Sequence, residues 1–318
     1  MSYDFNEIVE SGKLSPEQNE AIYAQKQIFA QFKIYAQPQE HPIAICIGGQ
    51  PGSGKTSVSG ELSALQGGYI RIDSDALRQF HPLFEAQNRA NDRLTGAYTS
   101  HDSGVWAQKM MKEALNKRMN IVFENPLTNT DKLLSRIDML NTAGYSVRAK
   151  MFVVSYDLTF LGVCSRYERS KKELGFGRFV HEEPLKKSLD NQIKTVVALQ
   201  QQGKLDAMEL RSRDSLIFSG NYRTADIAGV MKAEQTRKFS SEEVLMLKNK
   251  WANVCQMMIE RGAHKREFER ISRQMQARIS VCLKEQYPAF NVNHLINIKN
   301  DFNRTFQKVH SLSNGISF

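Results

Sequence analysis

What the chain lacks narrows its class before any motif is considered. No uninterrupted apolar run approaches the roughly 20 residues that a membrane-spanning helix requires. The opening stretch, MSYDFNEIVESGKL, has no basic segment followed by an apolar one, so we expect no secretory signal. Four cysteines occur, without a CxxC pair or a His/Cys cluster. We therefore expect reduced thiols in the cytoplasm rather than a disulfide frame or a zinc site.

Low-complexity tracts and internal repeats are also lacking, and the positive charge is unevenly distributed. The formal net charge is +9, and residues 235–318 hold 14 Lys and Arg against 7 Asp and Glu. A basic tail can bind nucleic acid or an acidic partner, or it can be an ordinary solvated face. No interleaving of aromatic and basic residues of the kind that stacks bases stands out, so nucleic acid is not the favoured partner.

Short apolar runs alternate with helical patterns along most of the chain, which indicates an open α/β sheet with right-handed crossovers. The run Ile43–Gly48 is apolar without alternation, as expected of a strand that is buried on both faces. The predicted strands are 43–48, 69–72, 120–123, 146–154, 208–210 and 215–218. The predicted helices are 15–35, 56–65, 103–118, 131–142, 157–174, 182–202, 241–284 and 294–310.

Changes of pattern divide the chain into three parts. Ser15-Pro16-Glu17-Gln18 predicts a capped helix start, and the proline-containing stretch 37–42 ends that helix. We expect residues 1–41 to be an N-terminal helical segment packed on the core, residues 42–225 to be an α/β domain, and residues 235–318 to be a basic helical region.

A glycine-rich loop follows the first predicted strand and precedes a predicted helix. Its pattern, GxxxxGK[ST], binds phosphate through backbone N–H groups and the start of the following helix. Lys55 would bridge the β- and γ-phosphates, and the Thr56 hydroxyl would bind Mg²⁺. We predict a P-loop phosphotransferase that uses ATP, or GTP as the alternative. The predicted nucleotide-binding residues are Gly49, Gln50, Pro51, Gly52, Ser53, Gly54, Lys55, Thr56 and Ser57.

Carboxylates follow two other predicted strands. Asp73 and Asp75 come after the strand at 69–72, and Glu124 follows the strand at 120–123. Because ligands of such sheets bind beyond the carboxyl ends of the strands, all three should share an edge with the glycine loop. Asp75 can accept a proton from a substrate hydroxyl, and Glu124 can hold a substrate hydroxyl or a magnesium-bound water. Helix capping or ion pairing is the alternative for each carboxylate.

Basic residues cluster around one predicted helix, with Arg166 on it and Arg178 after it. Guanidinium groups suit the charge that develops on a transferred phosphoryl group, although such a cluster is more often a solvated face. The glycines of Gly175-Phe176-Gly177-Arg178 would allow a mobile lid to carry Arg178 over the nucleotide. His81 and His101 have no metal-ligand spacing, so we expect them to shape the fold or the substrate site.

Together these stretches resemble the zeta-toxin family of bacterial kinases, in the family's order and at about its spacing. The resemblance covers roughly residues 15–220. The stretches are GGQPGSGKT (48–56), YIRIDSDALRQFHPLF (69–84), the H-D-S-x-x-W stretch (101–106), NIVFEN (120–125) and SRYERSKKELGFGRFV (165–180). The block with Asp-x-Asp and His-Pro beside the P-loop is specific to the family, whereas GxxxxGKT alone is not.

The resemblance implies a P-loop kinase fold, a three-layer α/β architecture with a mostly parallel sheet. It also implies ATP-dependent phosphorylation of the 3′-hydroxyl of UDP-N-acetylglucosamine or a related UDP-amino sugar, which would block peptidoglycan synthesis. It makes Asp75 the catalytic base, Glu124 a substrate-binding residue, and Arg166 and Arg178 phosphate-stabilising residues beside Lys55. We expect Asp75 and His81 also to contact the substrate. A small helical antitoxin protein is the implied partner.

Two departures leave the acceptor open. Family members usually continue from the glutamate with Gly-Thr, whereas Glu124 is followed by Asn125-Pro126-Leu127-Thr128. After the lid arginine this chain has His181-Glu182 in place of the family's His-Asp. A kinase for another acceptor, such as a nucleoside, a nucleic-acid end, an antibiotic or another sugar, is the first alternative. The second is an ATP-binding protein whose basic C-terminal region binds a partner or nucleic acid.

Overall fold

The computed structural model describes residues 4–274, and these fall into two compact units. Among the described residues, the first unit combines residues 4–163 with Phe176–Thr236, and the second combines Cys164–Gly175 with residues 237–274. Residues 164–175 therefore group with the C-terminal part, although they lie inside the stretch that the sequence assigns to the α/β domain. The three-part division expected from the sequence stays a prediction.

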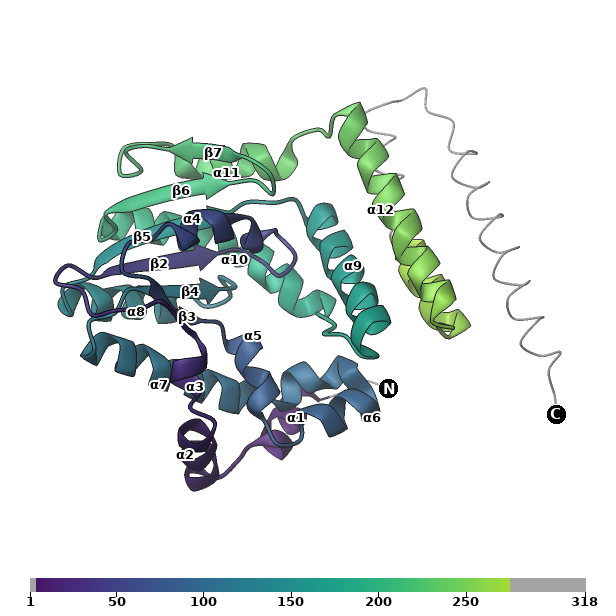
Figure 1. Ribbon diagram of the computed structural model, residues 1–318. Coiled ribbons are helices and arrows are strands. Elements are labelled where there is room, and N and C mark those ends of the chain that lie inside the picture. The colour runs from purple at the N-terminus through teal and green to yellow at the C-terminus, as the bar shows by residue number, and fades with distance from the viewer. Residues whose placement is uncertain (1–3, 275–318) are drawn as a thin grey trace. The chain divides into compact units, whose positions relative to one another are not determined.

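A seven-stranded sheet forms the centre of the first unit (Figure 1). Its order is β1-β3-β4-β2-β5-β6-β7, and the five inner strands run parallel while β1 and β7 pair antiparallel at the edges. This confirms the predicted α/β class with a mostly parallel sheet. The strands are β1 Lys33–Ile34, β2 Ile43–Gly48, β3 Tyr69–Ile72, β4 Ile121–Asn125, β5 Ser146–Phe152, β6 Ala207–Arg211 and β7 Leu216–Ser219.

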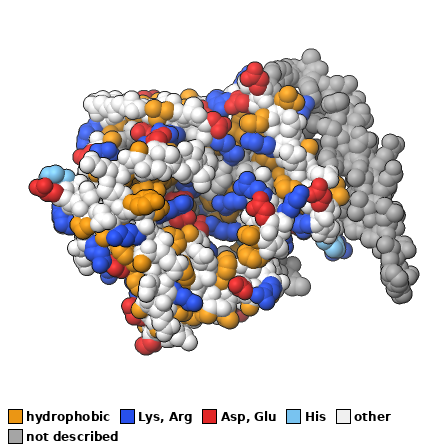
Figure 2. Space-filling view, viewed as in Figure 1, with side chains coloured by type: hydrophobic (Ala, Val, Ile, Leu, Met, Phe, Trp, Pro, Cys, Tyr) orange, Lys and Arg blue, Asp and Glu red, His pale blue; other side chains and the backbone are white. Residues whose placement is uncertain are grey.

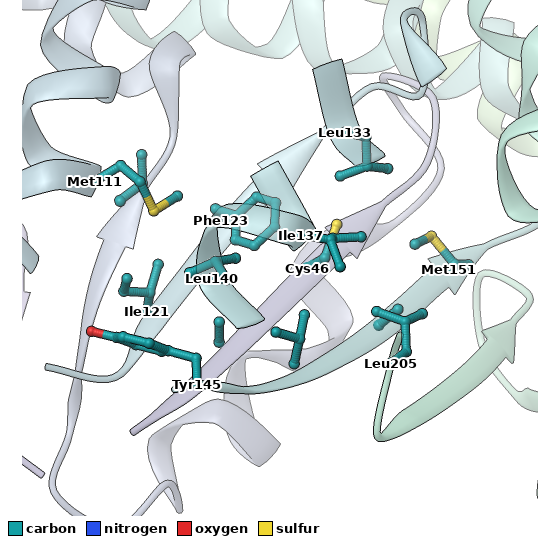
Figure 3. Packing of buried hydrophobic residues seen from close by; sticks show 14 of the residues in the cluster. Cys46, Met111, Ile121, Phe123, Leu133, Ile137, Leu140, Tyr145, Met151 and Leu205 are labelled. Carbon is teal, nitrogen blue, oxygen red and sulfur yellow. The ribbon is translucent and has the colours of Figure 1, made fainter. Parts of the chain in front are cut away.

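Both faces of the central strand β2 are covered, which explains its unbroken apolar sequence. Ala44 and Cys46 belong to the larger buried cluster on one face, and Ile45 and Ile47 belong to a smaller cluster on the other. Figure 3 shows Cys46 amid the packed side chains of the larger cluster. A strand with no solvent-facing row cannot show the apolar–polar alternation of a half-exposed strand.

Helices on the two faces complete a three-layer arrangement. The larger cluster takes side chains from α3 (Ile28–Gln31), α7 (Ser100–Asn116), α8 (Thr130–Thr142), α10 (Glu182–Gln202) and α11 (Ile227–Thr236). The smaller cluster takes Val58 and Leu62 from the turn η1 (Lys55–Val58) and from α4 (Ser59–Ser63). The helix α9 (Tyr156–Leu174) begins in the first unit.

The helix predicted after the glycine loop is shorter than the sequence pattern indicates. Instead of one helix over 56–65, the chain forms the 3₁₀ turn η1 and the five-residue helix α4. The Ser59 hydroxyl donates to the Thr56 carbonyl at 2.7 Å, and the Ser63 hydroxyl donates to the Ser59 carbonyl at 2.9 Å. Serine hydroxyls that bind nearby carbonyls compete with regular helical bonds, which accounts for the short element.

The N-terminal segment also differs from the prediction of one helix reaching Tyr35. The Ser15 capping box is present and α2 spans Pro16–Gln25, but Gln27 adopts a left-handed conformation with φ 47° and ends the helix. A helix that the sequence did not suggest, α1 (Phe5–Gly12), precedes α2. Helix α1 packs mainly on α6 (Phe84–Tyr98), and both α1 and α2 contact α7, so the N-terminal segment packs on these two helices.

Buried polar groups fasten this N-terminal segment to α7. Asp102, almost fully buried, accepts hydrogen bonds from the Leu14 backbone N–H at 3.2 Å and from Asn19 Nδ2 at 2.7 Å. Trp106 Nε1 donates to the Asn19 carbonyl at 2.9 Å. Two residues of the H-D-S-x-x-W stretch thus hold the segment in place.

Three further elements between β3 and α7 were not anticipated. They are α5 (Ser74–Leu77), the 3₁₀ turn η2 (Arg78–Phe80) and α6 (Phe84–Tyr98). Asn91 interrupts α6 with an extended conformation, φ −161° and ψ 90°. A helix that is broken in the middle and rich in polar residues gives a weak periodic signal.

The second unit is helical in its described part. Its helix α12 spans Ser241–Glu260, and residues 265–274 are also helical. Gly262, with φ 67°, separates the two, so the single helix predicted over 241–284 is divided. The predicted helix at 294–310 lies outside the described residues. Within residues 4–274, no helix has the length and apolar character needed to cross a bilayer.

Buried charges pair within this second unit. Arg261 donates to both carboxylate oxygens of Glu168, at 2.5 and 2.9 Å, and it also contacts Glu267 at 2.8 Å. The Glu168 side chain is only 3% exposed, so it depends on this partner. The pair therefore joins residues 164–175 to the turn after α12.

Candidate active site

The loop between β2 and η1 has a backbone that requires glycine. Gly52 has φ 81°, and a Cβ there would stand 2.7 Å from the Thr159 carbonyl oxygen. A Cβ on Gly49 would stand 2.9 Å from both Phe152 Cβ and Ser53 Oγ. The loop therefore approaches β5 and α9 more closely than any side chain allows. Such a loop turns its backbone amides toward an anion, which is the fit that a polyphosphate requires.

Polar side chains inside the loop attach it to its surroundings. Gln50 is buried and donates from Nε2 to the Val154 carbonyl at 2.6 Å and to Thr159 Oγ1 at 3.1 Å. Ser53 is fully buried, and its Oγ has no hydrogen-bond partner among the residues that the structure describes. An unsatisfied buried hydroxyl beside the glycines provides a further donor at the place where phosphate is expected.

Lys55 lies across the loop that precedes it. Its Nζ donates to the carbonyl oxygens of Gly49 at 2.9 Å and Gln50 at 3.2 Å. The same Nζ lies 3.9 Å from Glu124 Oε2, at the end of β4. Lys55 therefore connects the glycine loop with the neighbouring strand end, where the sequence predicts the acceptor.

Carboxylates of β3 and β4 meet at this same sheet edge through Arg71. Its Nη2 lies 3.0 Å from Glu124 Oε1 and 3.6 Å from Asp73 Oδ2. Asp73 caps α5 by accepting from the Asp75 N–H at 3.0 Å. Burial, with Glu124 and Asp75 nearby, raises the pKa of Asp73. Asp73 thus lies between two other carboxylates, and Arg71 offsets their effect on its pKa only in part.

Asp75 is held between two arginines. Arg78 Nε contacts Asp75 Oδ1 at 3.1 Å, and Arg178 forms an ion pair with Asp75 Oδ2. Burial alone would raise the pKa of Asp75, but Arg178 and Arg78 together lower it to about 2. In this arrangement the Asp75 carboxylate is ionised, and each of its two oxygens contacts an arginine.

The segment that carries Arg178 is docked on α6. The Gly177 N–H donates to the buried Asp92 carboxylate at 2.9 Å. Arg93 lies over the Phe179 ring, 4.4 Å from its centroid. The stretch predicted as a lid is therefore attached to α6 by polar and aromatic contacts.

Two predicted site residues remain, His81 and Arg166. The His81 side chain is completely buried, with Nε2 3.0 Å from the Gly12 carbonyl oxygen, 3.8 Å from Asp102 and the ring against Tyr98. The structure therefore does not bring His81 together with Asp73, Asp75 or Glu124, and it places the ring in the packing of α1. Arg166 belongs to the second unit, and its role stays a prediction.

Three arginines of this region were missed by sequence reasoning. Arg71 interrupts an otherwise apolar strand, which is a signal that could have drawn attention to it. Arg78 follows Asp75 by one helical turn, a spacing that favours an ion pair. Arg213, between β6 and β7, contacts the glycine loop and has no local sequence signal. Figure 2 shows basic and acidic side chains mingled near the middle of the drawn face.

The parallel sheet, the glycine loop after its central strand and the lysine that follows define a P-loop protein of the kinase type. The chain belongs to the zeta toxin family, because the family model "Zeta toxin" matches residues 26–222. Membership confirms the resemblance seen in the sequence, and it supports a toxin with a kinase-like function.

Individual proteins with similar sequences agree with this assignment. Toxin zeta of Enterococcus hirae is 26% identical over 209 residues, which cover 64% of this chain and 73% of that protein. Toxin PezT of Streptococcus pneumoniae serotype 4 is 28% identical over 130 residues, covering 41% of this chain and 51% of that protein.

Solved structures show a similar fold. A chain of the PezAT chromosomal toxin–antitoxin system of Streptococcus pneumoniae superposes with a TM-score of 0.65 at 19% identity, covering 78% of this chain and 98% of that one. A chain of the AvrRxo1-ORF1:-ORF2 complex with ATP gives 0.53 at 14% identity, covering 79% and 86%. Both likenesses support the P-loop kinase-type fold.

Proposed function

We propose that this protein is an ATP-dependent kinase that phosphorylates the 3′-hydroxyl of UDP-N-acetylglucosamine or a related UDP-amino sugar. The observation that carries the proposal is the contact of Lys55 with both the glycine loop and Glu124. It makes the phosphate-binding loop continuous with the carboxylates that would hold the acceptor. The same function is expected of zeta toxins, the family to which this chain belongs.

Each residue has a distinct role in the proposed reaction. The loop amides and Lys55 bind the β- and γ-phosphates of ATP. As Arg178 transfers from Asp75 to the phosphate, Asp75 becomes available to accept the proton of the acceptor hydroxyl. The hydroxyl oxygen bonds to the γ-phosphorus while the bond from that phosphorus to the ADP oxygen breaks. Glu124 holds the acceptor, and Arg166 is proposed to add positive charge.

Thr56 is the residue proposed to hold Mg²⁺. Within residues 4–274 no group of three His, Cys, Asp or Glu side chains is arranged for a metal, so a resident protein-only site is not indicated. A site to which the protein contributes the Thr56 hydroxyl fits Mg²⁺, because this ion keeps several waters and takes most of its other ligands from substrate phosphates. When bound, the ion neutralises charge on the phosphates.

The nucleoside end of ATP, or of GTP as the alternative, has room beside the loop. A cavity of about 280 Å³ is lined by Ser57 and the stretch 211–216.

The proposed partner is a small antitoxin protein, since the PezAT neighbour is described as part of a toxin–antitoxin system. Cys46 and Cys255 are free, buried thiols, which fits the proposed cytoplasmic location.

The loop after Glu124 favours a second candidate, a P-loop kinase for another acceptor. Leu127 is fully buried with φ 59°, a strained conformation for leucine, and its N–H bonds to Asn125 Oδ1 at 2.7 Å. Ser188 of α10 donates to the Pro126 carbonyl. A Gly-Thr sequence lacks these side chains, so this anchored loop would present a different surface to the acceptor.

The test measures ATP consumption with and without UDP-N-acetylglucosamine, followed by mass spectrometry of the sugar nucleotide. Wild type should add one phosphate to the sugar nucleotide, and Lys55→Ala should add none. Lys132→Ala, which removes an exposed lysine of α8, is the matched control and should behave as wild type. ATP consumption that requires a different acceptor would favour the second candidate. Equal ATP turnover by Lys55→Ala and wild type would overturn both.

A further inference from the structure

Arg213 joins two parts of the nucleotide-binding region that are far apart in sequence. It lies in the connection between β6 and β7, and its Nη2 donates to the Gly52 carbonyl at 2.5 Å and to the Leu158 carbonyl at 3.1 Å. Gly52 belongs to the glycine loop, and Leu158 lies in the first turn of α9. One guanidinium group therefore bridges the loop and the start of a helix.

Glycines leave the space that this bridge occupies. A Cβ on Gly162 of α9 would stand 2.7 Å from Arg213 Nη2 and 2.7 Å from the Gly52 carbonyl oxygen. A Cβ on Gly54 would stand 3.1 Å from Arg213 Cγ. The arginine is thus enclosed by backbone on two sides. This close approach is possible because both positions are glycines.

The charge of Arg213 is incompletely compensated in its enclosure. Burial lowers the pKa of the guanidinium, and the nearby Asp214 opposes that effect. Its Nε is buried and has no hydrogen-bond partner within the described part of the chain. A cation bound mainly to backbone carbonyls, immediately beside the loop, leaves positive potential where an anion would bind.

We propose that Arg213 is a positioning residue that fastens the phosphate-binding loop to the first turn of α9 and so holds the loop in its anion-binding shape. It acts through Gly52 rather than on the reacting atoms. Only the nucleotide arm of the test below rests on the proposed function. The fastening itself is a property of the protein without nucleotide.

Arg223 provides a matched control for the substitution of Arg213. Its Nη2 also donates to two carbonyl oxygens, those of Gly203 at 2.9 Å and Leu205 at 2.8 Å, in the connection between α10 and β6. Removing either arginine therefore breaks a similar set of bonds. Of the two, only Arg213 contacts the glycine loop, so a difference between the two variants in hydrogen exchange of that loop reports on positioning rather than on general stability.

The first measurement is hydrogen–deuterium exchange of the protein without nucleotide. Arg213→Ala should speed exchange of the loop amides at 50–57 and of the first turn of α9, whereas Arg223→Ala should leave both unchanged. Unchanged loop exchange in Arg213→Ala would overturn the proposal. This arm needs no ligand, so it stays decisive even if the protein binds no ATP, an outcome that would instead refute the proposed function.

The second measurement is the Kd for ATP by calorimetry. Arg213→Ala should bind ATP about tenfold more weakly, the factor expected when hydrogen bonds to a charged group are lost. Arg213→Lys, which keeps the charge and can reach one carbonyl, should recover part of the loss. Should Arg213→Ala fail to fold, Gly162→Ala disturbs the same contact from α9 and should speed loop exchange likewise. A Kd unchanged in all three variants would contradict the proposal.

Discussion

The ion pairs of Asp75 make a quantitative prediction about stability. The pKa of this carboxyl is lowered from an ordinary 3.8 to about 2 by its two arginines. That difference corresponds to roughly 2 kcal/mol of favourable interaction with the charged form. Because 37% of the Asp75 side chain is exposed, solvent screening reduces the expected stabilisation to about 1–1.5 kcal/mol. Asp75→Asn should lower the free energy of unfolding at pH 7 by this amount.

The sign of the pH dependence follows from the direction of the shift. A folded pKa below the unfolded value means that the stabilisation is fully present well above pH 3.8 and is lost as pH falls toward 2. The stability difference between wild type and Asp75→Asn should therefore be constant from pH 7 to pH 5 and smaller at pH 3. Asp190→Asn, which alters an exposed carboxylate of α10, should show no such change.

Urea unfolding followed by circular dichroism at pH 7, 5 and 3 measures these differences. A variant as stable as wild type at pH 7 would show that the two arginines do not stabilise the Asp75 carboxylate. A difference that persisted undiminished at pH 3 would show that packing, not charge, causes it. Either result would refute the electrostatic account of this site.

Three further predictions concern other contacts. Gly52→Ala should weaken ATP binding at least tenfold, measured by calorimetry, because the new Cβ would stand 2.7 Å from the Thr159 carbonyl oxygen. Asp102→Ala should cost about 1–3 kcal/mol by leaving buried donors of the N-terminal segment unpaired, and limited proteolysis should then cut that segment first. Arg261→Met should destabilise the second unit by about 3–5 kcal/mol in urea unfolding, since Glu168 would lose its partner, whereas Glu168→Gln in the same background should recover part of that loss.

The buried strands could be predicted because their sequences are dictated by their surroundings. Ile43–Gly48 and Tyr69–Ile72 have the bounds that the sequence predicts, as does the helix Glu182–Gln202. The helix after the glycine loop was predicted too long, because serine side chains bind carbonyls there in preference to continuing the helix. Apolar periodicity does not report this competition.

Parts of the candidate site could not be predicted because they depend on contacts across the fold. Asp73, Asp75 and Glu124 were expected at one edge on topological grounds, and Arg71 bridges two of them. Arg213 is 161 residues from Gly52 in sequence, and no local pattern connects them. The position of the His81 ring could not be predicted for the same reason, since its buried partner is a carbonyl near the N-terminus.

The attachment of the N-terminal segment has a consequence for where the folding unit begins. The match to the family model begins at residue 26, but Asp102 and Trp106 form hydrogen bonds with Leu14 and Asn19, before that point. A chain that began at residue 26 would expose an indole and a carboxylate that are buried in the whole protein. The region matched by sequence similarity and the region that packs as one folded unit therefore begin at different residues. A truncation guided by similarity alone would remove part of the protein's own interior.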